Sequence, residues 1–120
     1  MKKNIRVYEY LNCSTCKNAL RFLEKRGVEF ESIPIVDQPP TLTELKRMLG
    51  YLDGELRRLF NTSGQLYREM KIREKLPKLS ETEALKLLAT HGKLIKRPFL
   101  LTANAGIVGF KEAEWDKFFS

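Results

Sequence analysis

A chain of 120 residues can bury one apolar core without support from disulfides or a metal, so we expect a single domain over residues 1–120. The formal net charge is +7, but acidic residues interrupt the Lys and Arg residues through the middle of the chain, which argues against direct nucleic-acid binding. No apolar run approaches the roughly 20 residues that span a bilayer, and Met1–Lys3 leads into a strand-like segment rather than a signal peptide, so we expect no membrane association and a cytoplasmic location.

The first third of the chain predicts a strand, a helix and a second strand. Residues 5–10 alternate and are rich in β-branched and aromatic side chains, which is typical of a strand. Apolar residues then recur at helical spacing from 19 to 23, and Gly27 offers a left-handed end to that helix. Residues 28–36 predict the second strand. A strand-helix-strand unit of this length normally makes its two strands parallel neighbours.

Residues 41–92 predict a helical insertion. Thr41 and Glu44 have the spacing of a capping box at a helix start, and Ser80 and Glu83 repeat that spacing. Short apolar faces at helical spacing lie between the two capping boxes. We therefore expect three or four helices in this part of the chain.

The last part of the chain returns to strands and closes with a helix. Residues 94–101 and 107–110 predict strands joined by a turn at 103–106, and residues 112–119 predict a helix that carries Trp115 in the core. The order β-α-β, helical insertion, β-β-α describes an α/β fold with a thioredoxin-like mixed sheet.

Cys13 and Cys16 are the only cysteines and lie where the first strand gives way to the first helix. A helix N-terminus favours thiolate over thiol, so Cys13 is the expected nucleophile, and Cys16, on the same helical face, is placed to resolve a mixed disulfide on it. A zinc site needs four ligands, and the only other soft ligand is His91. A static disulfide is more typical of secreted proteins. We expect no bound metal or cofactor.

Three stretches resemble one known family along nearly the whole chain: Asn12–Asn18, Leu59–Gly64 followed by Tyr67 and Arg68, and Lys96–Pro98. They are similar to the arsenate reductase (ArsC)/Spx/MgsR family of glutaredoxin-like proteins. The resemblance implies a thioredoxin-like core in which Pro98 is cis and faces the reactive cysteine.

Departures from the family pattern bear on the activity. Glutathione-coupled arsenate reductases hold their oxyanion with three arginines, of which Arg97 matches one, while Leu59 and Gly109 stand opposite the other two. Nearby substitutes for the missing cations are Arg57, Arg58 and Arg68. Those reductases also lack a cysteine at the place of Cys16. A second cysteine is instead similar to the Spx branch, whose Cys-x-x-Cys acts as a disulfide switch.

The Spx branch regulates transcription by binding the C-terminal domain of the RNA polymerase α-subunit. The surface that it uses includes a glycine after the second helix, and Asp53-Gly54 stands in a comparable place. Because Asp-Gly is also a common turn, we favour a turn as the role of this pair.

From these patterns we expect a cytoplasmic thiol–disulfide redox protein in which Cys13 attacks, Cys16 resolves and Arg97 stabilises the thiolate or the incoming group. The expected partners are glutathione as a candidate co-substrate, glutaredoxin or a thiol-containing protein. The alternatives are a glutathione- or glutaredoxin-coupled arsenate reductase and an Spx-like redox-sensing regulator that binds the RNA polymerase α-subunit. The expected substrate-binding residues are Asn12, Ser14, Thr15, Lys17 and Pro98.

Overall fold

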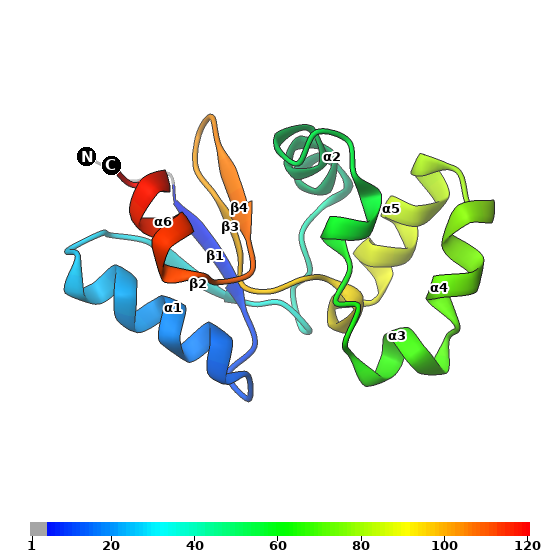
Figure 1. Ribbon diagram of the computed structural model, residues 1–120, viewed down its shortest axis with the longest axis horizontal. Coiled ribbons are helices and arrows are strands. Elements are labelled where there is room, and N and C mark those ends of the chain that lie inside the picture. The colour runs from blue at the N-terminus through cyan, green and yellow to red at the C-terminus, as the bar shows by residue number, and fades with distance from the viewer. Residues whose placement is uncertain (1–4) are drawn as a thin grey trace.

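Within residues 5–120, four strands form one mixed sheet at the centre of the protein (Figure 1). The computed structural model describes residues 5–120, so the expectation for Met1–Lys3 lies outside the described residues. The sheet order is β2-β1-β3-β4, with β1 and β2 parallel and the other two pairs antiparallel, as the thioredoxin-like prediction requires. The strands are β1 (Arg6–Glu9), β2 (Glu31–Pro34), β3 (Phe99–Leu101) and β4 (Gly106–Val108).

Helices account for most of the remaining chain, and the predicted insertion is helical in the structure. No helix of residues 5–120 combines the length and apolarity needed to cross a bilayer. The α-helices are α1 (Ser14–Lys25), α2 (Leu42–Tyr51), α3 (Gln65–Glu69), α4 (Ile72–Lys75), α5 (Glu81–Thr90) and α6 (Glu112–Phe118). Short 3₁₀ helices are η1 (Leu56–Leu59), η2 (Leu76–Lys78) and η3 (Gly92–Leu94).

The predicted local signals set the helix ends. Both capping boxes are formed, at the start of α2 by Thr41 and Glu44 and at the start of α5 by Ser80 and Glu83. Gly27 follows α1 with a φ of 73°, a left-handed conformation that glycine adopts without strain. The Asp53-Gly54 pair after α2 also lies in the left-handed region, as a turn does.

The sheet has an apolar layer on each face because side chains alternate along β1. Val7 packs with Leu23 of α1 and Trp115 of α6 in one cluster. Tyr8 packs in a second cluster with residues of the insertion such as Leu45 and Leu88. Helices α1 and α6 accordingly cover one face, while α2 and α5 cover the other (Figure 1).

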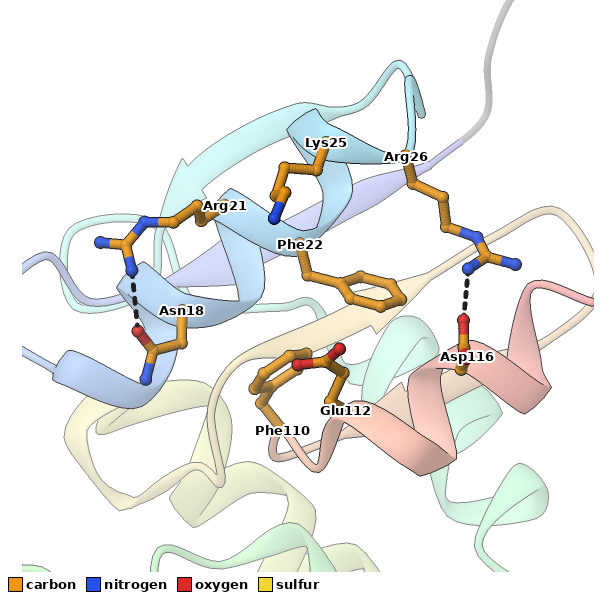
Figure 2. A pocket seen from close by; sticks show the side chains of 8 residues that line it. All are labelled: Asn18, Arg21, Phe22, Lys25, Arg26, Phe110, Glu112 and Asp116. Carbon is orange, nitrogen blue, oxygen red and sulfur yellow. Dashed lines mark hydrogen bonds and ion pairs between the residues drawn. The ribbon is translucent and has the colours of Figure 1, made fainter.

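Helices α1 and α6 meet through aromatic rings and one ion pair (Figure 2). The rings of Phe22 and Phe110 pack edge to face with centroids 5.7 Å apart, and Arg26 pairs with Asp116. Trp115 Nε1 donates to the Gly109 carbonyl at 2.8 Å. The hollow of about 440 Å³ that Figure 2 shows lies over these contacts and is not lined by either cysteine.

The predicted strand at residues 94–101 is wrong in its first part, where a bridge to the insertion replaces it. Asn61 N–H donates to the Leu94 carbonyl and Lys96 N–H donates to the Leu59 carbonyl, each at 2.7 Å, so Phe60 and Ile95 form an isolated antiparallel bridge. Strand β3 therefore starts only at Phe99. The bridge ties the insertion to the segment that leads into Pro98.

Gly92, the first residue of η3, lies against the backbone that follows β2. A Cβ added there would stand 2.1 Å from the Ile35 carbonyl oxygen and 3.1 Å from the Val36 Cα. Since Cβ atoms do not approach backbone this closely, only glycine lets η3 pack here.

A buried carboxylate joins α2 to β1. Glu44 accepts hydrogen bonds from the Tyr8 hydroxyl at 2.7 Å, the Thr41 N–H at 3.0 Å and Arg6 Nη1 at 2.7 Å. Burial acts to raise the pKa of Glu44, but these three donors outweigh it and hold the pKa below its ordinary value.

We predict that Glu44→Gln lowers the free energy of unfolding by about 1–3 kcal/mol at neutral pH, the range for hydrogen bonds to a buried charged group. Because the folded-state pKa is depressed, the carboxylate stabilises the fold above its unfolded pKa of about 4.3 and loses this effect as the pH falls through the folded-state value. The free energy of unfolding, measured by urea unfolding from pH 7 to pH 3, should therefore fall less steeply with decreasing pH in the variant than in the wild-type protein.

The control for this prediction is Glu83→Gln, which changes the matching residue of the exposed capping box at α5. Its loss at neutral pH should be the smaller of the two. Equal losses would show that the Tyr8 and Arg6 hydrogen bonds add nothing to a capping box.

Candidate active site

Cys13 is the N-cap residue of α1, at the end of the turn that follows β1. Its N–H donates to the Tyr10 carbonyl at 2.9 Å, and its carbonyl accepts from the Lys17 N–H at 3.1 Å. Cys13 is partly exposed and Cys16 is buried, and both are free thiols. The strand thus delivers one thiol to the surface and the helix buries the other.

The surroundings of Cys13 favour its thiolate. Partial burial acts to raise the pKa of this thiol, but hydrogen bonding from the Cys16 N–H and thiol, the Thr15 N–H and the Arg97 guanidinium outweighs burial and lowers the pKa. The N–H groups belong to the first turn of α1, where the helix dipole also favours an anion. We therefore expect Cys13 to be the more reactive thiol at neutral pH.

The surroundings of Cys16 do the opposite. Its side chain is 0 % exposed, and this burial raises its pKa to about 12, with the nearby Cys13 charge acting in the same direction. The Tyr10 N–H donates to Cys16 Sγ at 3.4 Å and only partly offsets the burial. Burial therefore favours the protonated form of Cys16 at neutral pH.

Arg97 stands beside the thiols and is held in place from two sides. Its guanidinium carbon lies 4.6 Å from the centroid of the Tyr10 ring, and its Nη1 donates to the Lys93 carbonyl at 3.2 Å. The Arg97–Pro98 peptide bond is cis, as the resemblance implied, and Pro98 is buried. The cation is thus fixed where it lowers the pKa of Cys13.

Tyr10 is a site residue that the sequence reasoning missed. It was expected only as part of a strand, yet its N–H contacts Cys16, its carbonyl contacts Cys13 and its ring contacts Arg97. An aromatic residue three positions before the first cysteine was the available signal.

A cleft of about 600 Å³ opens beside the first turn of α1, where Thr15 lines it. Its charged lining is mostly basic, so it suits an anionic group. The basic lining residues are Arg57, Arg58, Lys96 and Lys111, and the acidic ones are Glu55 and Glu114. Lys96 and Lys111 had not been expected from the sequence, because they reach the cleft from segments far apart in the chain.

The two positions that the resemblance aligns with oxyanion-binding arginines carry no cation. Leu59 is buried in the core, and Gly109 has a φ of 69° with Lys96 packed over it, so that an added Cβ would lie 3.0 Å from Lys96 Cε. Of the proposed substitutes, Arg57 and Arg58 line the cleft, whereas Arg68 donates to the Ser63 carbonyl at 3.0 Å and is not among the lining residues.

The remaining predicted binding residues are scattered around Cys13. Asn12 is exposed in the turn before it and lines a second hollow, on the β2 side of the site. Ser14 and Lys17 are exposed on the first turn of α1 and line neither the cleft nor this hollow. Within residues 5–120, no three His, Cys, Asp or Glu side chains gather as a metal site would require.

Comparisons with known proteins agree on one family. The model of the ArsC family matches residues 8–118. An uncharacterized Bacillus subtilis protein, YusI, is 42% identical over 114 residues, covering 95% of this chain and 97% of that protein. An arsenate reductase of Neisseria meningitidis is 31% identical over 106 residues, covering 88% of this chain and 89% of the reductase.

Regulators and a solved structure are also among the similar proteins. Relatives named MgsR and Spx are transcriptional or regulatory proteins by name. The crystal structure of an ArsC family related protein from Bacteroides fragilis matches with a TM-score of 0.89 and 41% identity, over 95% of this chain and 96% of that one. By name, the similar proteins thus include arsenate reductases, regulators and an uncharacterized protein.

We predict that iodoacetamide alkylates Cys13 faster than Cys16 at every pH from 6 to 9, because Cys13 is partly exposed with a lowered pKa and Cys16 is buried with a raised one. Peptide mapping of the wild-type protein after timed alkylation measures both rates. The Cys13→Ser variant reports on Cys16 alone and should react slowly throughout. Faster labelling of Cys16 near neutral pH would reverse the assigned roles.

Proposed function

We propose that this chain, which belongs to the ArsC family, is a thiol–disulfide oxidoreductase in which Cys13 attacks and Cys16 resolves. The observation that carries the proposal is the opposite environment of the two thiols. One is partly exposed with its pKa lowered, and the other is buried with its pKa raised to about 12. This difference means that Cys13 reacts first and Cys16 second.

The proposed reaction moves two electrons from the protein to a disulfide substrate. The Cys13 thiolate attacks one sulfur of the substrate, a Cys13–substrate bond forms, and the substrate's other thiolate leaves with the electron pair of the broken S–S bond. That thiolate takes the proton of Cys16, and the Cys16 thiolate then attacks Cys13 Sγ. The second substrate thiolate leaves and is protonated by water, and a Cys13–Cys16 disulfide remains.

A thiol reductant must return the two electrons, and two molecules of glutathione or a glutaredoxin are the candidates. The basic cleft beside Thr15 supports a substrate or reductant that carries carboxylates. Arg97 stabilises the Cys13 thiolate in this proposal, and the backbone at Pro98 holds the group attached to the substrate sulfur. We place the reaction in the cytoplasm, where thiols are kept reduced.

Arsenate reduction at Cys13 is the second candidate function, and Arg57 and Arg58 are the observation that favours it. Both arginines line the cleft, so they stand near the places where the family's oxyanion-binding arginines are missing. The Cys13 thiolate would displace one arsenate oxygen as water, and two molecules of glutathione, oxidised to their disulfide, would supply the two electrons that take As(V) to As(III). The neutral residues Leu59 and Gly109 weigh against it.

We predict that Arg97→Ala raises the pKa of Cys13 and slows its disulfide exchange while leaving the fold intact. The lost Tyr10 contact is worth about 1 kcal/mol, so the melting temperature should change little. Alkylation rate against pH measures the Cys13 pKa in each variant. Arg97→Lys should recover only part of the effect, because an ammonium keeps the charge but lacks the planar fork. Unchanged alkylation kinetics in Arg97→Ala would place Arg97 in the scaffold.

We also predict that glutathionylated disulfides are turned over at least a hundredfold faster, by kcat/KM, than arsenate, with glutathione and glutaredoxin supplied to both. One fixed oxyanion donor is commonly worth about 3–4 kcal/mol, and two of the three family arginines are absent. If arsenate is instead the better substrate, Arg57→Ala and Arg58→Ala should abolish its turnover while Arg68→Ala does not. Turnover of neither substrate by a protein that forms the Cys13–Cys16 disulfide would favour a regulator that binds RNA polymerase.

A further inference from the structure

A second hollow, of about 360 Å³, borders the reactive turn on the side away from the basic cleft. It lies past the carboxyl ends of the parallel strands β1 and β2. Its walls are the turn at residues 10–12, just before Cys13, and the segment 34–37 that follows β2, with Lys93 at one side.

Exposed apolar side chains gather at this hollow. Leu11 is 63% exposed and Val36 is 38% exposed, and both line it. They are two of the four large apolar residues that the described part of the chain exposes, the others being Leu42 and Tyr51 on α2. A single exposed leucine needs no explanation, but a pair at the rim of a hollow beside a reactive thiol indicates a contact surface.

The hollow is also lined by Glu9, a carboxylate that is almost completely buried. Glu9 is only 5% exposed, and its Oε2 accepts a hydrogen bond from the Ser32 hydroxyl at 2.7 Å. Its Oε1 is buried and accepts no hydrogen bond from any residue between 5 and 120. Buried carboxylate oxygens are nearly always paired, so Glu9, which lines the hollow, has a hydrogen-bonding capacity that the surrounding residues 5–120 leave unused.

The two sides of the reactive thiol therefore differ in charge. The hollow on the β2 side carries Glu9 and Asp37 against Lys93. The cleft on the β4 side carries four cations against two carboxylates. A small symmetric disulfide gains little from a difference in charge between the hollow and the cleft. A peptide chain with different residues on either side of its cysteine can contact the hollow with one side and the cleft with the other.

We propose that the hollow of Leu11, Val36 and Glu9 receives the residues next to an oxidised cysteine in a protein substrate, an apolar side chain and a basic or amide donor. This rests on the proposed function and names its substrate class as protein disulfides. Leu11 stands two residues before Cys13 and lines the hollow. When a cysteine of the substrate protein is bonded to Cys13, the substrate residues next to that cysteine therefore lie near Leu11. The bonds made and broken are those of the proposed reaction, with the partner's cysteine sulfur as the atom attacked.

The test compares three disulfides of glutathione: with mercaptoethanol, with a peptide that has Lys and Leu before its cysteine, and with a peptide that has glycines there. The wild-type protein should reduce the Lys-Leu peptide at least tenfold faster, by kcat/KM, than the other two. The double variant Leu11→Ser with Val36→Thr should lose this preference and keep its rate on the mercaptoethanol disulfide within twofold.

The matched control is Leu42→Ser, which removes an exposed leucine that is 43% exposed but lies on α2 and does not line the hollow. It should keep the full preference. Glu9→Gln, which removes the charge and keeps the shape, should reduce the preference for the Lys-Leu peptide over the glycine peptide. Equal rates on all three substrates, or a preference that survives in the double variant, would overturn the proposal.

A binding arm separates this proposal from the proposed function. The Lys-Leu peptide with serine in place of its cysteine cannot react, and its binding to the wild-type protein is followed by chemical-shift changes at Leu11 and Val36. If no disulfide is reduced but this peptide binds at the hollow, the oxidoreductase function fails and the contact surface stands. If disulfides are reduced and the peptide leaves both residues unshifted, the contact surface is wrong and the function stands.

Discussion

The backbone of Tyr10 fixes the positions of both thiols. Its carbonyl accepts from Cys13, its N–H donates to Cys16, and its ring carries the Arg97 guanidinium. Tyr10 can hold these three partners because it directly follows β1, whose side chains are anchored in apolar clusters on both faces of the sheet. A rigid strand end gives the thiol pair a defined geometry, which a flexible loop would not supply.

A second constraint links chemistry to the insertion. The bridge between Phe60 and Ile95 brings η1 beside the segment that leads into Pro98, and so places Arg57 and Arg58 near the first turn of α1. The positive side of the site is therefore built by chain that is remote in sequence from the cysteines. Substitutions inside the insertion would therefore change the charge of the cleft beside Cys13 without changing the residues that set the position of the thiol.

Local patterns predicted the elements well, because capping boxes, the glycine after α1 and apolar periodicity act within a few residues. They also placed Cys13 and Cys16 at a helix start. Strand limits failed where a long-range contact decided them, as at Ile95, which pairs with the insertion rather than extending β3. The site roles of Tyr10, Lys96 and Lys111 were not predicted for the same reason, since each role depends on neighbours that only the folded chain supplies.

The close approach of Gly92 to Ile35 has an evolutionary consequence. Since no side chain fits between η3 and the backbone after β2, the spacing of these segments is closed to gradual change. Leu11 and Val36 stand on the outside of that fixed frame, partly in solvent, where exchanges disturb little of the core. Substitutions can therefore change the surface at Leu11 and Val36 one residue at a time, while the spacing that Gly92 sets between η3 and the backbone after β2 stays the same.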